Sequence, residues 1–125
     1  MRIVTSFDPI EVGELDNFAF DFTADVGDAA IASTAWVCAL APYQTAVDPA
    51  PQSCIISVSP QSAIRVRSPV NGSLQIREGS FSVALVGGMP FSAAGATYIL
   101  EATANLSDGR VLKLNATLEC KSPGT

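Results

Sequence analysis

Five carboxylates lie close together near the start of the chain, and they are the first residues whose type and spacing suggest chemistry. They are Asp8, Glu11, Glu14, Asp16 and Asp21. Carboxylates can ligate calcium, but this spacing matches no calcium-loop motif. A glycosidase pair would need two acids converging in a cleft, which nothing in the sequence indicates. We interpret these acids as a solvated or interface edge, with a calcium site as the alternative.

The chain contains three cysteines, Cys38, Cys54 and Cys120, and no histidine. Without histidine, a Ser–His or Cys–His nucleophile cannot form within the chain. Cys38 is flanked by Trp36 and Leu40, and Cys120 falls on the apolar face of a strand, so both indicate packing. The first residues show no export signal, which favours free buried thiols over the alternative of a Cys38–Cys54 bridge. We predict no enzymatic activity, no catalytic residues, no metal and no cofactor.

Composition limits the classes of partner. The 125 residues are 48% hydrophobic and 15% charged, with a net charge of −5. A surface this poor in charge favours assembly with other proteins. The acidic balance argues against nucleic-acid binding, which needs a basic footprint. No segment approaches the ~20 apolar residues of a membrane span, so we predict no membrane contact.

The last part of the chain, Thr97 to Cys120, predicts an antiparallel hairpin. Apolar and polar residues alternate on both sides of Ser107-Asp108-Gly109, as in half-buried strands. Residues directly opposite each other in a hairpin share a face, so a two-residue loop would place Lys113 opposite Ala104 in the core. A three-residue loop with Gly109 in a left-handed conformation avoids this. The predicted pairs are Leu106–Arg110, Ala104–Leu112, Ala102–Leu114, Leu100–Ala116 and Tyr98–Leu118.

Earlier segments predict further short strands. Ile3 to Val12 includes an edge strand broken by Pro9, and Asp16 to Thr23 places three phenylalanines on one core face. In Ala30 to Leu40, Ile31 and Trp36 are an odd number of residues apart, so a regular strand would place them on opposite faces. Burying both requires either a bulge or a strand covered on both faces. The three phenylalanines are Phe18, Phe20 and Phe22.

The middle of the chain is rich in proline. Its predicted strands are Ser53 to Ser59 and Phe81 to Leu85, with a hairpin around Asn71-Gly72 between them. In that hairpin the apolar residues Ile64 and Val66 of one strand are expected to lie across from Leu74 and Ile76 of the other. Matching these apolar faces brings Arg65 or Arg67 opposite Arg77, which is an unfavourable pairing of like charges.

These elements predict an all-β fold, an immunoglobulin-like antiparallel β-sandwich of about seven to nine strands. Tyr98 follows the Gly95-Ala96-Thr97 corner, where such sandwiches keep a tyrosine whose hydroxyl bonds nearby backbone. We expect a single domain over residues 1–125, with a loop-rich insertion at 41–80.

Three blocks of residues stand out along the chain. The first block is Asp8-Pro9-Ile10-Glu11 with Phe18-Ala19-Phe20-Asp21-Phe22; the second is Gly27-Asp28 with Ile31-Ala32-Ser33-Thr34-Ala35-Trp36-Val37-Cys38; the third is Leu85-Val86-Gly87-Gly88, Gly95-Ala96-Thr97-Tyr98 and Ser107-Asp108-Gly109-Arg110. In this order and spacing they resemble a family of small phage proteins described as fibre–tail adaptor or head–tail region virion proteins. The resemblance implies an immunoglobulin-like sandwich, no enzymatic role and copies arrayed in a ring on a virion, and it transfers no catalytic residues. Ala41 to Ser80 is longer and richer in proline than the family pattern.

The resemblance and the composition together suggest a phage or prophage structural protein at the tail, collar or head–tail junction. It would be an adaptor that binds other virion proteins, localised to the virion after assembly in the host cytoplasm. We expect the contacts in the acidic Asp8–Asp16 segment and the Ala41–Ser80 insertion. The alternatives are a capsid decoration protein and a secreted adhesin-type module.

Overall fold

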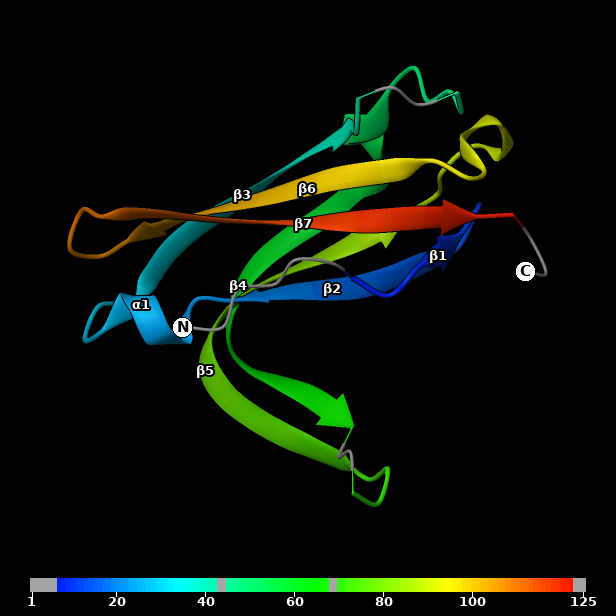
Figure 1. Ribbon diagram of the computed structural model, residues 1–125. Helices are drawn as coiled ribbons and strands as arrows, with labels where there is room; N and C mark the ends of the chain where they lie inside the picture. Colours follow the sequence, from blue (N-terminus) through cyan, green and yellow to red (C-terminus); the bar gives the residue numbers. More distant parts are fainter. Residues whose placement is uncertain (1–6, 43–44, 68–69, 123–125) are drawn as a thin grey trace.

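The computed structural model describes residues 7–42, 45–67 and 70–122, with the side chains of 66 and 67 excepted. This part of the chain forms two packed β-sheets (Figure 1). No helix within it is long and apolar enough to cross a membrane. The elements are β1 (Ile10–Glu11), β2 (Leu15–Asp21), α1 (Thr23–Val26), β3 (Ile31–Leu40), the 3-10 turn η1 (Pro51–Cys54), β4 (Ile55–Arg67), β5 (Leu74–Gly87), the 3-10 turn η2 (Phe91–Ala93), β6 (Thr97–Leu106) and β7 (Val111–Lys121).

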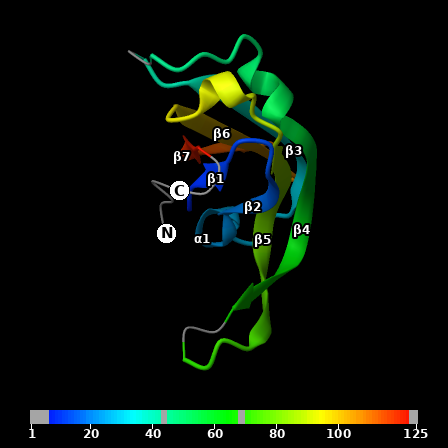
Figure 2. The same ribbon diagram turned by 90° about the vertical axis from the view of Figure 1, so that its right-hand side faces the viewer.

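One sheet has the strand order β1-β7-β6-β3 and the other has the order β2-β5-β4. All neighbours are antiparallel except β1, which runs parallel to β7. The two sheets lie face to face and enclose the core (Figure 2). The predicted all-β sandwich is therefore confirmed at the level of two packed sheets.

The aromatic core follows the sequence pattern. Phe18, Phe20 and Phe22 are all buried, as predicted. Trp36 packs edge-on against Phe20, with ring centroids 4.9 Å apart. Its indole Nε1 donates a 2.7 Å hydrogen bond to the hydroxyl of Ser82, which is also buried. The two sheets are thus joined by an aromatic contact and by a hydrogen bond between two buried polar groups.

The register of the β6–β7 hairpin is the one that parity predicts. Ala104 faces Leu112 and Tyr98 faces Leu118, with the pairs between them in step. The N–H of Leu106 donates to the carbonyl of Arg110 at 2.9 Å, which closes a three-residue loop. Gly109 has φ +91°, so its expected left-handed conformation is confirmed.

β3 contains a bulge, which explains how Ile31 and Trp36 can share a face although they are an odd number of residues apart. The register with β6 shifts between Ile31 and Ser33. After the shift, Trp36 and Cys38 both face the core. The bulge predicted as one of two explanations is therefore present.

Tyr98 opens β6 as expected, but the expected partner of its hydroxyl was wrong. The hydroxyl donates a 2.7 Å hydrogen bond to Oδ2 of Asp48, a side chain in the loop before η1, and not to nearby backbone. Burial, followed by this bond to Asp48, raises the pKa of Tyr98 above its ordinary value of 10. The bond ties the 45–50 segment to the end of the sandwich.

Two long strands replace several short ones in the middle of the chain. β4 runs from Ile55 to Arg67 through Pro60, which an edge strand tolerates because it does not need that N–H. β5 joins the two strands that were expected separately around Ile76 and Val83. Irregular structure in the expected 41–80 insertion is thus concentrated before β4.

The N-terminal segment adds an edge strand after Pro9. Ile10 and Glu11 form β1 beside Cys120 and Lys121 of β7. The N–H of Phe7 also donates to a β7 carbonyl, that of Thr117, at 2.9 Å. The first part of the predicted Ile3 to Val12 segment lies outside the described residues.

Candidate functional site

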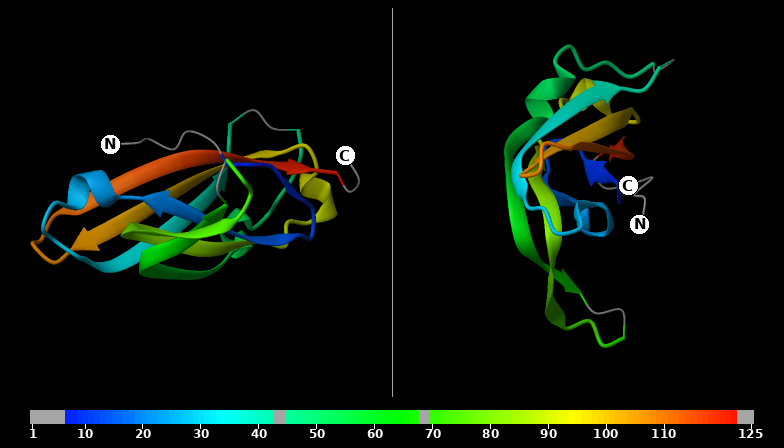
Figure 3. Two further views of the ribbon diagram at one scale, coloured as in Figure 1. Left: turned by 90° about the horizontal axis from the view of Figure 1, so that it is seen from below. Right: turned by 90° about the vertical axis from the view of Figure 1, so that its left-hand side faces the viewer.

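The outer halves of β4 and β5 extend beyond the sandwich as a two-stranded arm, which we define as residues 61–67 and 70–80 (Figures 1 and 2). The register shifts between Gln61 and Ala63, where Gly79 and Ser80 of β5 lie opposite the single residue Ser62. A bulge of this kind bends a strand pair and increases its twist. The bend directs the arm away from the β1-β7-β6-β3 sheet, as the right-hand view of Figure 3 shows.

The base of the arm is held against the start of α1. The N–H of Ser80 donates to Oγ1 of Thr23 at 2.9 Å, and the N–H of Phe22 donates to the carbonyl of Ser80 at 2.9 Å. A Cβ on Gly79 would overlap Oγ1 of Thr23 and lie 2.9 Å from the Phe81 ring. Only glycine fits this base without displacing a neighbour.

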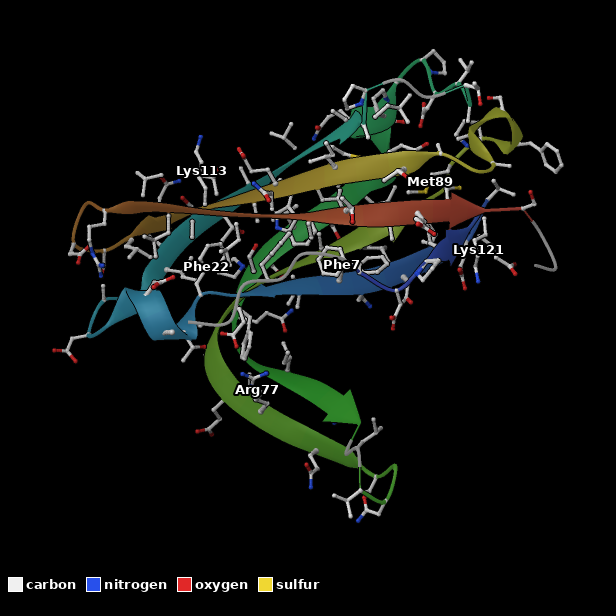
Figure 4. The ribbon with its side chains drawn as sticks, viewed as in Figure 1. Phe7, Phe22, Arg77, Met89, Lys113 and Lys121 are labelled. Atoms are coloured by element: carbon white, nitrogen blue, oxygen red, sulfur yellow. The ribbon has the colours of Figure 1, made fainter. Side chains whose placement is uncertain are left out.

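Arg77 forms a second anchor for the arm (Figure 4). Its Nη2 bonds Oδ2 of Asp21 in β2 at 2.7 Å, and its guanidinium lies 5.8 Å from the centroid of the Phe81 ring. Phe81 is buried, yet it does not belong to the cluster between the sheets. The arm therefore has a small packing centre of its own, made of a cation, an aromatic ring and a carboxylate.

The far end of the arm exposes large apolar side chains. Leu74 is 59% exposed, Ile76 is 70% exposed and Val70 is 91% exposed. Arg65 is exposed beside them and lines a hollow of about 230 Å³ together with Leu74 and Ile76. Apolar side chains gathered at a projecting tip are typical of a surface that contacts another protein.

The strand register of the arm differs from the one expected for matched apolar faces. Arg65 lies opposite Ile76, and Ile64 lies opposite Arg77. The like-charge pairing that the sequence suggested therefore does not occur. Each arginine faces an apolar residue because the arm has no core beneath it that would force all apolar residues to one side.

The acidic N-terminal segment forms a corner where β1 turns into β2. Glu14 accepts the N–H of Glu11 at 2.9 Å through Oε1, and Asp16 accepts the N–H of Asn17 at 2.7 Å through Oδ1. Among the described residues, no group of three or more histidine, cysteine or acidic side chains is placed to hold a metal. Asp21, the fifth acid, instead belongs to the arm's anchor.

All three cysteines are free and buried. The sulfurs of Cys38 and Cys54 are 3.1 Å apart, close enough for a thiol–thiol hydrogen bond and too far for a disulfide. This bond and burial raise the pKa of Cys38, and the same bond lowers the pKa of Cys54 against the opposing effect of burial. Burial raises the pKa of Cys120. The thiols pack within the sandwich, as the sequence indicates.

The free edge of β3 is partly covered by a side chain. Gln52 of η1 accepts the N–H of Cys38 at 2.8 Å and donates to the carbonyl of Trp36 at 2.9 Å. The side-chain amide thus takes the place of a neighbouring strand at this position. Covering an edge in this way limits strand-to-strand association there.

The sequence predicts partner contacts in the Asp8–Asp16 segment and in Ala41–Ser80, but it does not identify the side chains that anchor the arm. Arg77 and Asp21 are 56 residues apart in the sequence, and no local sequence pattern predicts that they pair. A glycine between Glu78 and Ser80 was the one available signal, because glycine within a strand often marks a bulge. Comparison of the chain with protein-family models finds no match, and comparison with curated proteins finds none either.

Proposed function

We propose that the chain is a structural protein of a phage or prophage virion, an adaptor that binds neighbouring virion proteins at the tail, collar or head–tail junction. The arm is the observation that supports a binding role, and the virion assignment rests on the resemblance of the three sequence blocks. Its base is anchored by Arg77 and Gly79, and its tip exposes Leu74 and Ile76 to a partner. An anchored projection with an apolar end suits a fixed joint between proteins.

The proposal includes an immunoglobulin-like topology. In that fold an edge segment, then the last, the penultimate and the third strand form one sheet, as in the order β1-β7-β6-β3. The order β2-β5-β4 corresponds to the opposite sheet. Trp36 on β3 and Tyr98 at the start of β6 occupy positions where such domains keep these residues, which supports the assignment.

The residues that resemble the phage family have structural roles here. Gly88 has φ +72°, Gly95 has φ +85° and Gly109 has φ +91°, so these three of the motif glycines stand where the backbone has a positive φ that favours glycine. The motifs therefore support a shared scaffold. The proposed adaptor has no catalytic role, and it carries out its function by binding.

Quantitative mass spectrometry of purified particles tests the proposal. The particles come from the phage or induced prophage whose genome encodes the chain, and the major capsid protein serves as the internal standard. We expect peptides of this chain at tens of copies or fewer per particle, as for a symmetric ring at one site. Hundreds of copies would favour the capsid decoration protein. Absence from particles would refute both.

A further inference from the structure

The arm and the acidic corner are complementary in charge. The arm contains three of the seven lysines and arginines of the chain, of which Arg77 already pairs with Asp21, and only one of the twelve acids. The corner, residues 8–16, contains four acids and no lysine or arginine. Lys121 of β7 lies in register with Glu11 at the edge of this corner. The arm therefore has a net positive charge, and the remainder of the chain has a net negative charge.

The two surfaces also match in their apolar content. Leu15 is 54% exposed at the start of β2, between the exposed Glu14 and Asp16. This is an apolar centre with an acidic rim. The tip of the arm presents the inverse, with Leu74 and Ile76 beside Arg65. An apolar centre excludes water while complementary charges at the rim set orientation.

The corner is as well anchored as the arm. The N–H of Gly13 donates to the carbonyl of Met89 at 3.1 Å, and the N–H of Gly88 donates to the carbonyl of Glu14 at 3.0 Å. A Cβ on Gly87 would overlap the Glu14 carbonyl, so the backbones pack directly there. Two preformed surfaces lose little conformational freedom when they meet.

We propose that the arm of one copy of this chain binds the acidic corner of a second copy. The inference rests on the proposed function, because it identifies one of the neighbours that the adaptor contacts. The arm and the corner are different parts of the molecule, so each copy offers one surface and accepts one. Such a head-to-tail interface generates a closed ring or an open chain, whichever its rotation dictates.

The exposed areas are small, so the contact is weak in isolation and depends on charge. Screening by salt is strong beyond about 10 Å at 0.1 M ionic strength. Self-association of the full chain at low salt and high concentration should therefore decline as salt is added. Sedimentation equilibrium measures this directly as the average mass.

Two double substitutions, one in each surface, give the sharpest test. Neither of them introduces a charge. The arm variant is Leu74→Ser/Ile76→Ser, and the corner variant is Leu15→Ser/Asp16→Asn. Each variant alone should remain a monomer, because it has lost one of the two surfaces. An equimolar mixture should form a dimer of one copy of each and nothing larger, because one intact arm and one intact corner remain. The matched control, Val111→Ser, alters a side chain 56% exposed on β7 and should associate like the wild type.

Thermal unfolding first establishes that each variant is folded. A wild-type chain that stays monomeric at low salt would overturn the inference, as would a mixture of the two variants that stays monomeric. Association of the arm variant at wild-type strength would overturn it equally. None of these results alters the count of copies in purified particles, so failure of the inference and failure of the proposed function are separately visible.

Discussion

Gly79→Ala tests whether the arm is held at its base in the way the structure indicates. The added Cβ overlaps Oγ1 of Thr23 and comes within 2.9 Å of the Phe81 ring. The backbone at Gly79 imposes no left-handed conformation, so the clash is the dominant cost. Thr23 can avoid it only by turning Oγ1 away from the N–H of Ser80, which breaks their 2.9 Å hydrogen bond.

The expected loss of stability follows from these two effects. Overpacking a filled site costs about 1–3 kcal/mol. A lost hydrogen bond costs about 1 kcal/mol, and it replaces part of the clash when Thr23 rotates. We therefore expect Gly79→Ala to lower the free energy of unfolding by about 1–3 kcal/mol. For a domain of this size the melting temperature should fall by about 4 °C per kcal/mol.

Urea unfolding, followed by the fluorescence of the single tryptophan, measures the change. Ser62→Ala is the matched control, because Ser62 is exposed on the opposite side of the same bulge and should shift stability by less than about 0.5 kcal/mol. Thr23→Ala removes the nearest obstacle, so Gly79→Ala should cost less in that background. An equal cost in both backgrounds, or no cost at all, would refute this account of the arm's base.

Three further predictions concern the sandwich. Gly109→Val should destabilise the chain by about 1–2 kcal/mol, because a branched residue is strained at φ +91°, and an unchanged melting temperature would contradict the loop assignment. Tyr98→Phe should cost about 1–3 kcal/mol by leaving the Asp48 carboxylate without its 2.7 Å donor, as urea unfolding can measure. Because the pKa of Tyr98 is raised in the folded state, wild-type stability should fall as pH rises above about 10, whereas the phenylalanine variant should lack this contribution. Thiol titration in denaturant should find three free thiols, and treatment of the folded chain with diamide should remove two by joining Cys38 to Cys54; three thiols remaining after treatment would contradict the 3.1 Å approach.

The β6–β7 hairpin was predictable because burial constrains it. Its inward face packs on the core, so a register error of one residue would place Lys113 inside, and parity alone selects the loop. The aromatic strand containing Phe18 and Phe20 was predictable for the same reason. In both cases the sequence alternates because one side of the strand is dry.

The arm was only partly predictable because it has no such constraint. Ile64 and Ile76 were expected to share an apolar face, but both of the arm's faces lie outside the sandwich, and the observed pairs put each isoleucine opposite an arginine. Its anchor depends on Asp21, a residue distant in the chain that the sequence assigned to an acidic edge. Tertiary contacts of this kind leave no periodic signal.

We propose that the chain acts by presenting its arm to neighbouring virion proteins. The most direct measurement is plaque titre of a phage lacking this gene, complemented with variants of the full chain. Leu74→Ser/Ile76→Ser should melt at the wild-type temperature yet fail to restore plaques, whereas Val111→Ser should restore them fully. Full restoration by a stable arm variant would contradict the claim.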